Sequence, residues 1–150
     1  MLKEGDIAPD IHLQTDTGED FDLKAHRGRK IILYFDPRAD TPGCTIEACE
    51  FRDEGPQFVS KDALIVGVSP DTVSAQAKFK QKFDLNFILL ADKDKEAAIA
   101  YDVLKEKNMY GKKVMGVERT TFLIDEKGRI AKIFNKVKPE GHAMAVLNAV

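Results

Sequence analysis

The sequence predicts an α/β fold in which a mixed central sheet is flanked by helices. Continuous apolar segments at residues 30–35 and 63–68 have the length of buried strands, and each is followed by a segment with helical spacing. Two further apolar segments, 120–124 and 129–134, flank Asp-Glu-Lys-Gly, which is typical of a hairpin. Right-handed connections would make the early central strands parallel, with the hairpin adding antiparallel strands at an edge.

The elements follow in order along the chain. Residues 11–13 and 21–23 alternate apolar and polar side chains around Thr-Asp-Thr-Gly-Glu, which predicts a short N-terminal β-hairpin. The strand at 30–35 is apolar along its length and is expected at the centre of the sheet. The helix after it ends at Gly55-Pro56. The remaining expected elements are a strand at 63–68, a helix at 72–83, a short strand at 86–90, a helix at 95–101 and a final helix from about Pro139.

The only two cysteines, Cys44 and Cys49, lie in the helix that follows the first central strand. Thr41 is placed to cap this helix and Pro42 suits its first position, so Cys44 falls in the first turn. The unpaired N–H groups and the dipole there favour a negative charge such as a thiolate, the nucleophilic form of cysteine. Gly43 leaves the backbone beside the sulfur open to a small substrate. The pattern indicates a reactive thiol with a second thiol close behind it.

The spacing of the two cysteines limits their chemistry. It is not the C-x-x-C of a thioredoxin-type motif. Residues five apart on a helix lie roughly 8.6 Å apart at Cα, whereas a disulfide tolerates about 7 Å at most. Cys44 and Cys49 can therefore bond only if the first turns of the helix unwind. Two other roles stay open on spacing alone: inert core thiols, and less plausibly zinc ligands, since no histidine has matching spacing.

Composition describes an ordinary soluble domain. The 150 residues are expected to form one domain, 1–150, with 43% hydrophobic and 32% charged residues. A net charge of −2 gives no support for a nucleic-acid or anionic-membrane partner. The start of the chain has no signal-peptide pattern, and no apolar run reaches membrane-spanning length. A cytoplasmic location is expected, where a cysteine pair is more often catalytic than structural.

The segment YFDPRADTPGCTIEACEFRD resembles the active-site segment of peroxiredoxins. Pro37, Thr41 and Cys44 match the family pattern P-x-x-x-T-x-x-C, and the second cysteine on the helix points to the bacterioferritin comigratory protein, or peroxiredoxin Q, branch. A second segment, 109–125, is also similar to that branch, and within it Arg119 aligns with the active-site arginine of the family. From the residues alone, Arg119 would be a solvated strand residue.

One position departs from the family pattern. Peroxiredoxins usually have an aromatic residue where this chain has Asp36. A carboxylate close to Cys44 would disfavour the thiolate unless Arg38 or solvent offsets its charge.

The resemblance implies a thioredoxin-like fold and a thiol peroxidase. Cys44 would attack a hydroperoxide, with Thr41, the Cys44 N–H and Arg119 holding the peroxide oxygens and Pro37 and Gly43 shaping the space around them. The sulfenic acid would condense with Cys49 to an intramolecular disulfide, and thioredoxin or a glutaredoxin would reduce it. No metal, haem, flavin or nucleotide is required, and a monomer is expected. The alternatives are a protein disulfide oxidoreductase and a non-catalytic thioredoxin-like binding domain.

Overall fold

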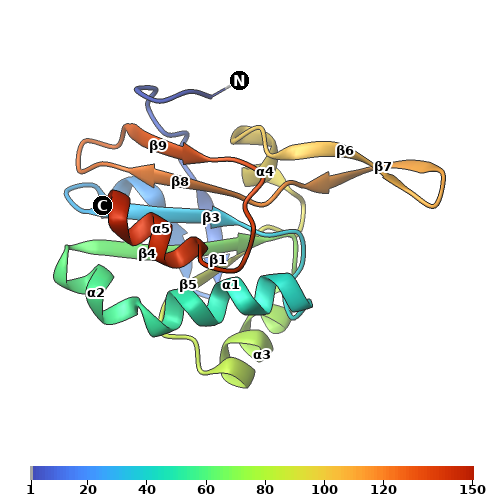
Figure 1. Ribbon diagram of the computed structural model, residues 1–150, viewed down its shortest axis with the longest axis horizontal. Coiled ribbons are helices and arrows are strands. Elements are labelled where there is room, and N and C mark those ends of the chain that lie inside the picture. Colours follow the sequence, from blue (N-terminus) through green and yellow to red (C-terminus); the bar gives the residue numbers. More distant parts are fainter. Residues whose placement is uncertain (1) are drawn as a thin grey trace.

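The computed structural model describes residues 2–150, which form two β-sheets and a set of flanking helices (Figure 1). The strands are β1 (His12–Thr15), β2 (Asp20–Asp22), β3 (Lys30–Phe35), β4 (Ala63–Ser69), β5 (Ile88–Ala91), β6 (Leu104–Met109), β7 (Lys112–Val117), β8 (Thr120–Ile124) and β9 (Ile130–Phe134). The α-helices are α1 (Pro42–Asp53), α2 (Gly55–Ser60), α3 (Val73–Phe83), α4 (Glu96–Ala100) and α5 (His142–Ala149), with a 3₁₀ turn at Leu23–His26. Seven strands make the main sheet in the order β2–β1–β5–β4–β3–β8–β9.

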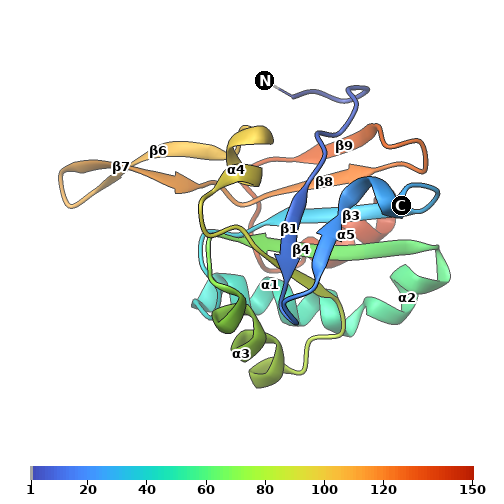
Figure 2. The ribbon, with the colours of Figure 1, turned by 180° about the vertical axis from the view of Figure 1, so that it is seen from behind.

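Strand β3 lies at the centre of the main sheet and is buried on both faces. Ile31, Leu33 and Phe35 pack into one apolar cluster, whereas Ile32 and Tyr34 pack into the other. Alternate side chains of a strand point to opposite faces, so a strand that is apolar throughout can serve two cores. Helices α1, α3 and α5 lie on one face of the sheet (Figure 1). Helix α4 and the N-terminal hairpin are in front in the view from behind (Figure 2).

The predicted sheet is confirmed. Strands β3, β4 and β5 are parallel, and the β8–β9 hairpin adds antiparallel strands at one edge. The N-terminal hairpin closes the other side, because β1 pairs antiparallel with β5. No helix within residues 2–150 is both long and apolar enough to span a bilayer.

Three features differ from the expectations. Gly55-Pro56 ends α1 as predicted, but the same proline also starts the short helix α2. Helix α5 begins at His142, later than Pro139. The antiparallel arm of β6 and β7 was not predicted, and it extends away from the main sheet (Figures 1 and 2). Strand β7 is mostly exposed and the described residues of β6 are half-buried or exposed, so these lysine-rich strands lack the apolar alternation by which strands are found in sequence.

The register of the sheet brings two distant segments together. Phe35, the last residue of β3, is paired with Thr120, the first residue of β8. Since these strands are antiparallel, the residue after Phe35 and the residue before Thr120 are neighbours at one edge of the sheet. These two residues are Asp36 and Arg119.

Candidate active site

Cys44 lies in the first turn of α1, where the sequence predicted it, directly beyond the carboxyl end of β3. Thr41 occupies the N-cap position and Pro42 the first helical position. The Thr41 hydroxyl does not cap the helix; it donates instead to the Arg38 carbonyl at 2.9 Å. Cys44 is 1% exposed.

Arg119 comes from the loop between β7 and β8 and reaches the same sulfur. Its Nη2 donates to Cys44 Sγ at 3.2 Å, and its Nε donates to an Asp36 carboxylate oxygen at 3.0 Å. The arginine side chain is only 20% exposed. The interpretation of Arg119 as a solvated residue is therefore wrong, and its guanidinium lies beside the Cys44 sulfur.

Gly43 lies against the guanidinium. A Cβ at this position would come within 3.0 Å of Arg119 Nη2 and 3.3 Å of Pro139 Cγ. The space that the sequence assigned to an approaching substrate is thus filled by the arginine. Pro37 is half-buried in the loop that joins β3 to α1.

Two carboxyl groups, Asp36 and Glu47, lie beside the thiol and are almost fully buried, at 4% and 0% exposure. Arg119 Nε is 3.0 Å from Asp36 Oδ1 and 3.7 Å from Glu47 Oε1. Burial raises the pKa of Asp36, while hydrogen bonds with Glu47, Arg119 and Cys44 and the guanidinium charge lower it in part. Burial and the adjacent Asp36 raise the pKa of Glu47 well above its usual range.

The balance of charges around Cys44 favours a neutral thiol in the resting protein. Burial raises its pKa first and the charge on Asp36 raises it further, whereas hydrogen bonds with Thr41, the Arg38 backbone and Arg119 lower it. The Arg38 side chain is exposed and forms no ion pair with Asp36 among the described residues. The positive charge that balances the Asp36 carboxylate therefore comes from Arg119 and not from Arg38.

His142 is a buried neighbour of the site that sequence reasoning did not assign. Its Nε2 is 2.7 Å from the Thr121 hydroxyl and 3.8 Å from Glu47 Oε2. Burial and the charge of Arg119 lower the pKa of His142 to about 4, so the ring is neutral at neutral pH. No local pattern marks His142, because the fold alone brings the start of α5 against α1.

Cys49 lies on the same helix as Cys44 but is half-buried rather than buried. Both cysteines are free thiols. The two sulfurs therefore sit on an intact helix without a bond between them, in keeping with the expected helical separation.

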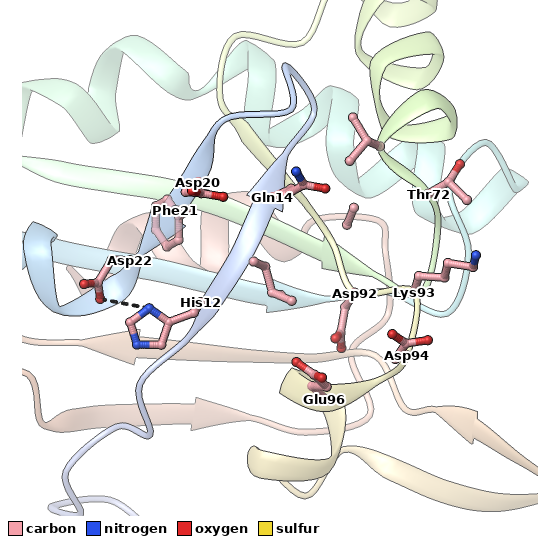
Figure 3. Close-up of a pocket in the computed structure, with 13 residues that line it drawn as sticks. His12, Gln14, Asp20, Phe21, Asp22, Thr72, Asp92, Lys93, Asp94 and Glu96 are labelled. Atoms are coloured by element: carbon pink, nitrogen blue, oxygen red, sulfur yellow. Dashed lines mark ion pairs between the residues drawn. The ribbon is translucent and has the colours of Figure 1, made fainter.

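A surface hollow of about 730 Å³ lies elsewhere, between the N-terminal hairpin and the segment that joins β5 to α4 (Figure 3). Its wall is acidic and includes Asp92, Asp94 and Glu96, but neither cysteine contributes to it. Within residues 2–150, only Asp10, His12 and Asp22 bring three potential metal-binding side chains together, and they belong to this N-terminal region. The hollow contains no thiol, so its chemistry differs from that around Cys44.

Comparisons with known proteins match nearly the whole chain. The model of the AhpC/TSA family matches residues 5–133. Peroxiredoxin Bcp of Bacillus subtilis is 47% identical over 99% of this chain and 95% of its own length. Peroxiredoxin Bcp of Xanthomonas campestris pv. campestris is 43% identical over 94% of this chain and 88% of its own.

Solved structures agree in fold as well as in sequence. The bacterioferritin comigratory protein of Xanthomonas campestris, studied for its alkyl peroxide reduction activity, superposes with a TM-score of 0.92 and 41% identity over 99% of this chain and 95% of that one. Two variants of peroxiredoxin Q from the same organism, each with a different cysteine changed to serine, also superpose with a TM-score of 0.92. The two cysteines changed in those variants lie far apart in the sequence of that protein, whereas Cys44 and Cys49 share one helix.

Proposed function

Because the chain belongs to the AhpC/TSA family, and within it to the peroxiredoxins of the Bcp and peroxiredoxin Q type, we propose that Cys44 is the thiol with which it reduces hydroperoxides. The observation that carries this assignment is the donation from Arg119 Nη2 to Cys44 Sγ at 3.2 Å. An invariably charged planar donor at a buried sulfur stabilises the thiolate and any negative charge that develops beside it.

In the first step, the Cys44 thiolate attacks one peroxide oxygen. A sulfur–oxygen bond forms, the oxygen–oxygen bond breaks, and water or an alcohol leaves after the departing oxygen takes up a proton. The product is a sulfenic acid. Thr41, the backbone N–H of Cys44 and Arg119 hold the two peroxide oxygens, and Pro37 and Gly43 shape the loop and the helix start around them.

In the second step, Cys49 condenses with the sulfenic acid and water is lost. The first turns of α1 must open, since the helical separation is too great for a disulfide. Cys49 suits this role because the chain contains no other cysteine. A dithiol reductant, either thioredoxin or a glutaredoxin, then restores both thiols by exchange. The cycle needs one chain only, so the enzyme acts as a monomer, in the reducing cytoplasm.

A stopped-flow experiment tests the assignment. The reduced protein is mixed with hydrogen peroxide or tert-butyl hydroperoxide, with and without thioredoxin and its reductase, beside Cys44→Ser as the matched inactive control. We expect a rapid stoichiometric burst without reductant and continuous consumption with it, both abolished in Cys44→Ser. Rapid exchange with protein disulfides but not with peroxide would identify a disulfide oxidoreductase. Reaction at the rate of a free thiol would identify a non-catalytic domain.

A further inference from the structure

Asp36 and Glu47 form a buried carboxyl pair directly behind the reactive thiol. Among the described residues, Arg119 is the one guanidinium that contacts both, through the same Nε atom, and it also donates to Cys44. Ionisation of all three acidic groups would leave three negative charges against one positive charge in a buried site. Like charges this close cannot all be ionised, so the group of residues must retain protons.

The hydrogen bonds indicate where the protons reside. Neither carboxyl oxygen of Glu47 has an N–H or O–H donor among the described residues, since Arg119 Nε and His142 Nε2 lie 3.7 and 3.8 Å away. Asp36 and Glu47 lie against the same Arg119 Nε atom, but only Asp36 is within hydrogen-bonding distance of it. A buried carboxyl group without a hydrogen-bond donor is favoured in its neutral, protonated form. Asp36 has the arginine donor at 3.0 Å, so Asp36 is the ionised member and Glu47 the protonated one.

Asp36 and Cys44 are held by the same guanidinium, Asp36 through Arg119 Nε and Cys44 through Arg119 Nη2. The two side chains line one small cavity of about 10 Å³, together with Ser69 and Gln76. An ionised carboxylate can accept the S–H proton, and the guanidinium that contacts both groups can then balance the charge on the sulfur in place of the charge on Asp36.

We propose that Asp36 is the acid–base group of this peroxidase: it takes the thiol proton of Cys44 and returns it to the departing peroxide oxygen, while Arg119 holds it in position and Glu47 stays protonated. This inference rests on the proposed function of Cys44.

The proton and electron balance closes within the site. The S–H bond of Cys44 breaks and its proton moves to Asp36, leaving a thiolate beside Arg119. The thiolate gives an electron pair to one peroxide oxygen, the sulfur–oxygen bond forms and the oxygen–oxygen bond breaks. The departing alkoxide or hydroxide takes the proton from Asp36, which returns to its ionised state. Sulfur is oxidised and the peroxide oxygen is reduced.

The test compares leaving groups that do and do not need a proton. An alkoxide from tert-butyl hydroperoxide must be protonated, whereas the carboxylate released from peracetic acid need not be. Asp36→Asn removes the acid–base group but also removes a negative charge beside Cys44, so its thiolate should form at lower pH. We expect Asp36→Asn to react with tert-butyl hydroperoxide on the order of 10²-fold more slowly than the wild type, with peracetic acid reduced at an unchanged or higher rate. Asp94→Asn, an exposed loop change, is the matched control.

Each outcome is decisive. A rate for Asp36→Asn that equals or exceeds that of the wild type with both oxidants would show that Asp36 is only an electrostatic burden on the thiolate. Equal slowing with both would show that Asp36 merely positions Arg119. If Asp36→Asn does not fold, the solvent deuterium isotope effect of the wild type replaces it: it should clearly exceed unity for tert-butyl hydroperoxide and approach unity for peracetic acid. The wild-type burst tests the proposed function separately, because it requires Cys44 but not this proton route.

Discussion

At the scale of single residues, the position of the Arg119 side chain depends on the absence of a side chain at Gly43. The guanidinium packs against the helix start where any side chain at Gly43 would be, at 3.0 Å from a Cβ. Its Nε donates a hydrogen bond to Asp36, and its Nη2 donates one to Cys44. A planar fork can serve two acceptors in fixed directions, which a lysine ammonium cannot reproduce. The position therefore requires both the charge and the shape of arginine.

Arg119→Ala should raise the pKa of Cys44 and slow sulfenic acid formation by roughly 10²–10³-fold, because removal of one charged donor at a developing negative charge has effects of this size. Arg119→Lys should restore only part of the rate. The thiolate absorbance as a function of pH and the second-order rate constant for peroxide are the two measurements. Lys138→Ala is the control for loss of a positive charge. An unchanged rate constant in Arg119→Ala would remove this residue from the site.

The sequence predicts the individual site residues unevenly. Thr41, Pro42 and Cys44 are adjacent in a local helix-start pattern, so spacing alone indicated a reactive thiol. Arg119 carries no local signal, and only the family resemblance placed it at the site. Glu47 and His142 were not assigned, because what distinguishes them is burial against each other, which depends on α1 packing against α5.

Helix α1 links the chemistry to a change of conformation at the scale of the element. It carries both thiols, and its far side contacts α5: Glu50 accepts from the Gly141 N–H at 2.9 Å, and the Phe51 ring stacks edge-on against His142. Both contacts lie beyond Cys49, so they can persist while the first turns open. The contact between Glu47 and His142 lies between the two cysteines and must loosen when the turns open.

Cys49→Ser should leave the first oxidation of Cys44 nearly intact but abolish the intramolecular disulfide and most turnover with thioredoxin. The sulfenic acid should then last long enough to react with a dimedone-type probe, or proceed to sulfinic acid at high peroxide. Mass spectrometry of oxidised wild type is the check on the assignment. A disulfide between Cys44 and another chain or a small thiol, with Cys49 still reduced, would contradict the resolving role.

The elements of the main sheet were predictable, and the arm was not, for a physical reason. Strands β3 and β4 are buried on both faces and therefore appear as continuous apolar runs. Among the described residues, strands β6 and β7 pair only with each other, and most side chains of β7 are exposed. Selection for apolar side chains is therefore weak along this arm. The turn between α1 and α2 was marked by Gly55-Pro56, but a sequence cannot distinguish a proline that ends one helix from one that begins the next.

Two buried groups make the stability of the whole molecule depend on pH in opposite directions. The Glu47 carboxyl has a pKa well above 4.5 in the folded state. Its contribution to the free energy of unfolding is therefore fully present below pH 4.5 and is lost as the pH rises through the folded-state pKa. His142 is a base with its pKa lowered from 6.5 to about 4, so its contribution is present above 6.5 and is lost as pH falls through about 4. As far as these two groups determine it, the free energy of unfolding should be highest between pH 4.5 and pH 6.5.

Glu47→Gln should therefore flatten the alkaline side of the stability profile. The comparison is made in a Cys44→Ser background, because ionisation of the thiol would also reduce stability at high pH. The free energy of unfolding in urea is measured from about pH 6 to about pH 9, and it should decline less steeply with Glu47→Gln than without it. Glu126→Gln, at an exposed turn, is the control. Parallel profiles would show that Glu47 does not titrate in this range.

The β6–β7 arm has a consequence for how chains of this kind can change in length. Its strands are joined by Tyr110 and Gly111, which both have positive φ, at 54° and 78°, as in the tightest hairpin turns. The Tyr110 side chain is fully exposed. Residues added at this tip would lengthen the ribbon outward without entering either apolar core or shifting the register of the main sheet. Insertions and deletions during evolution, and loops or labels grafted by an engineer, are best tolerated at this turn.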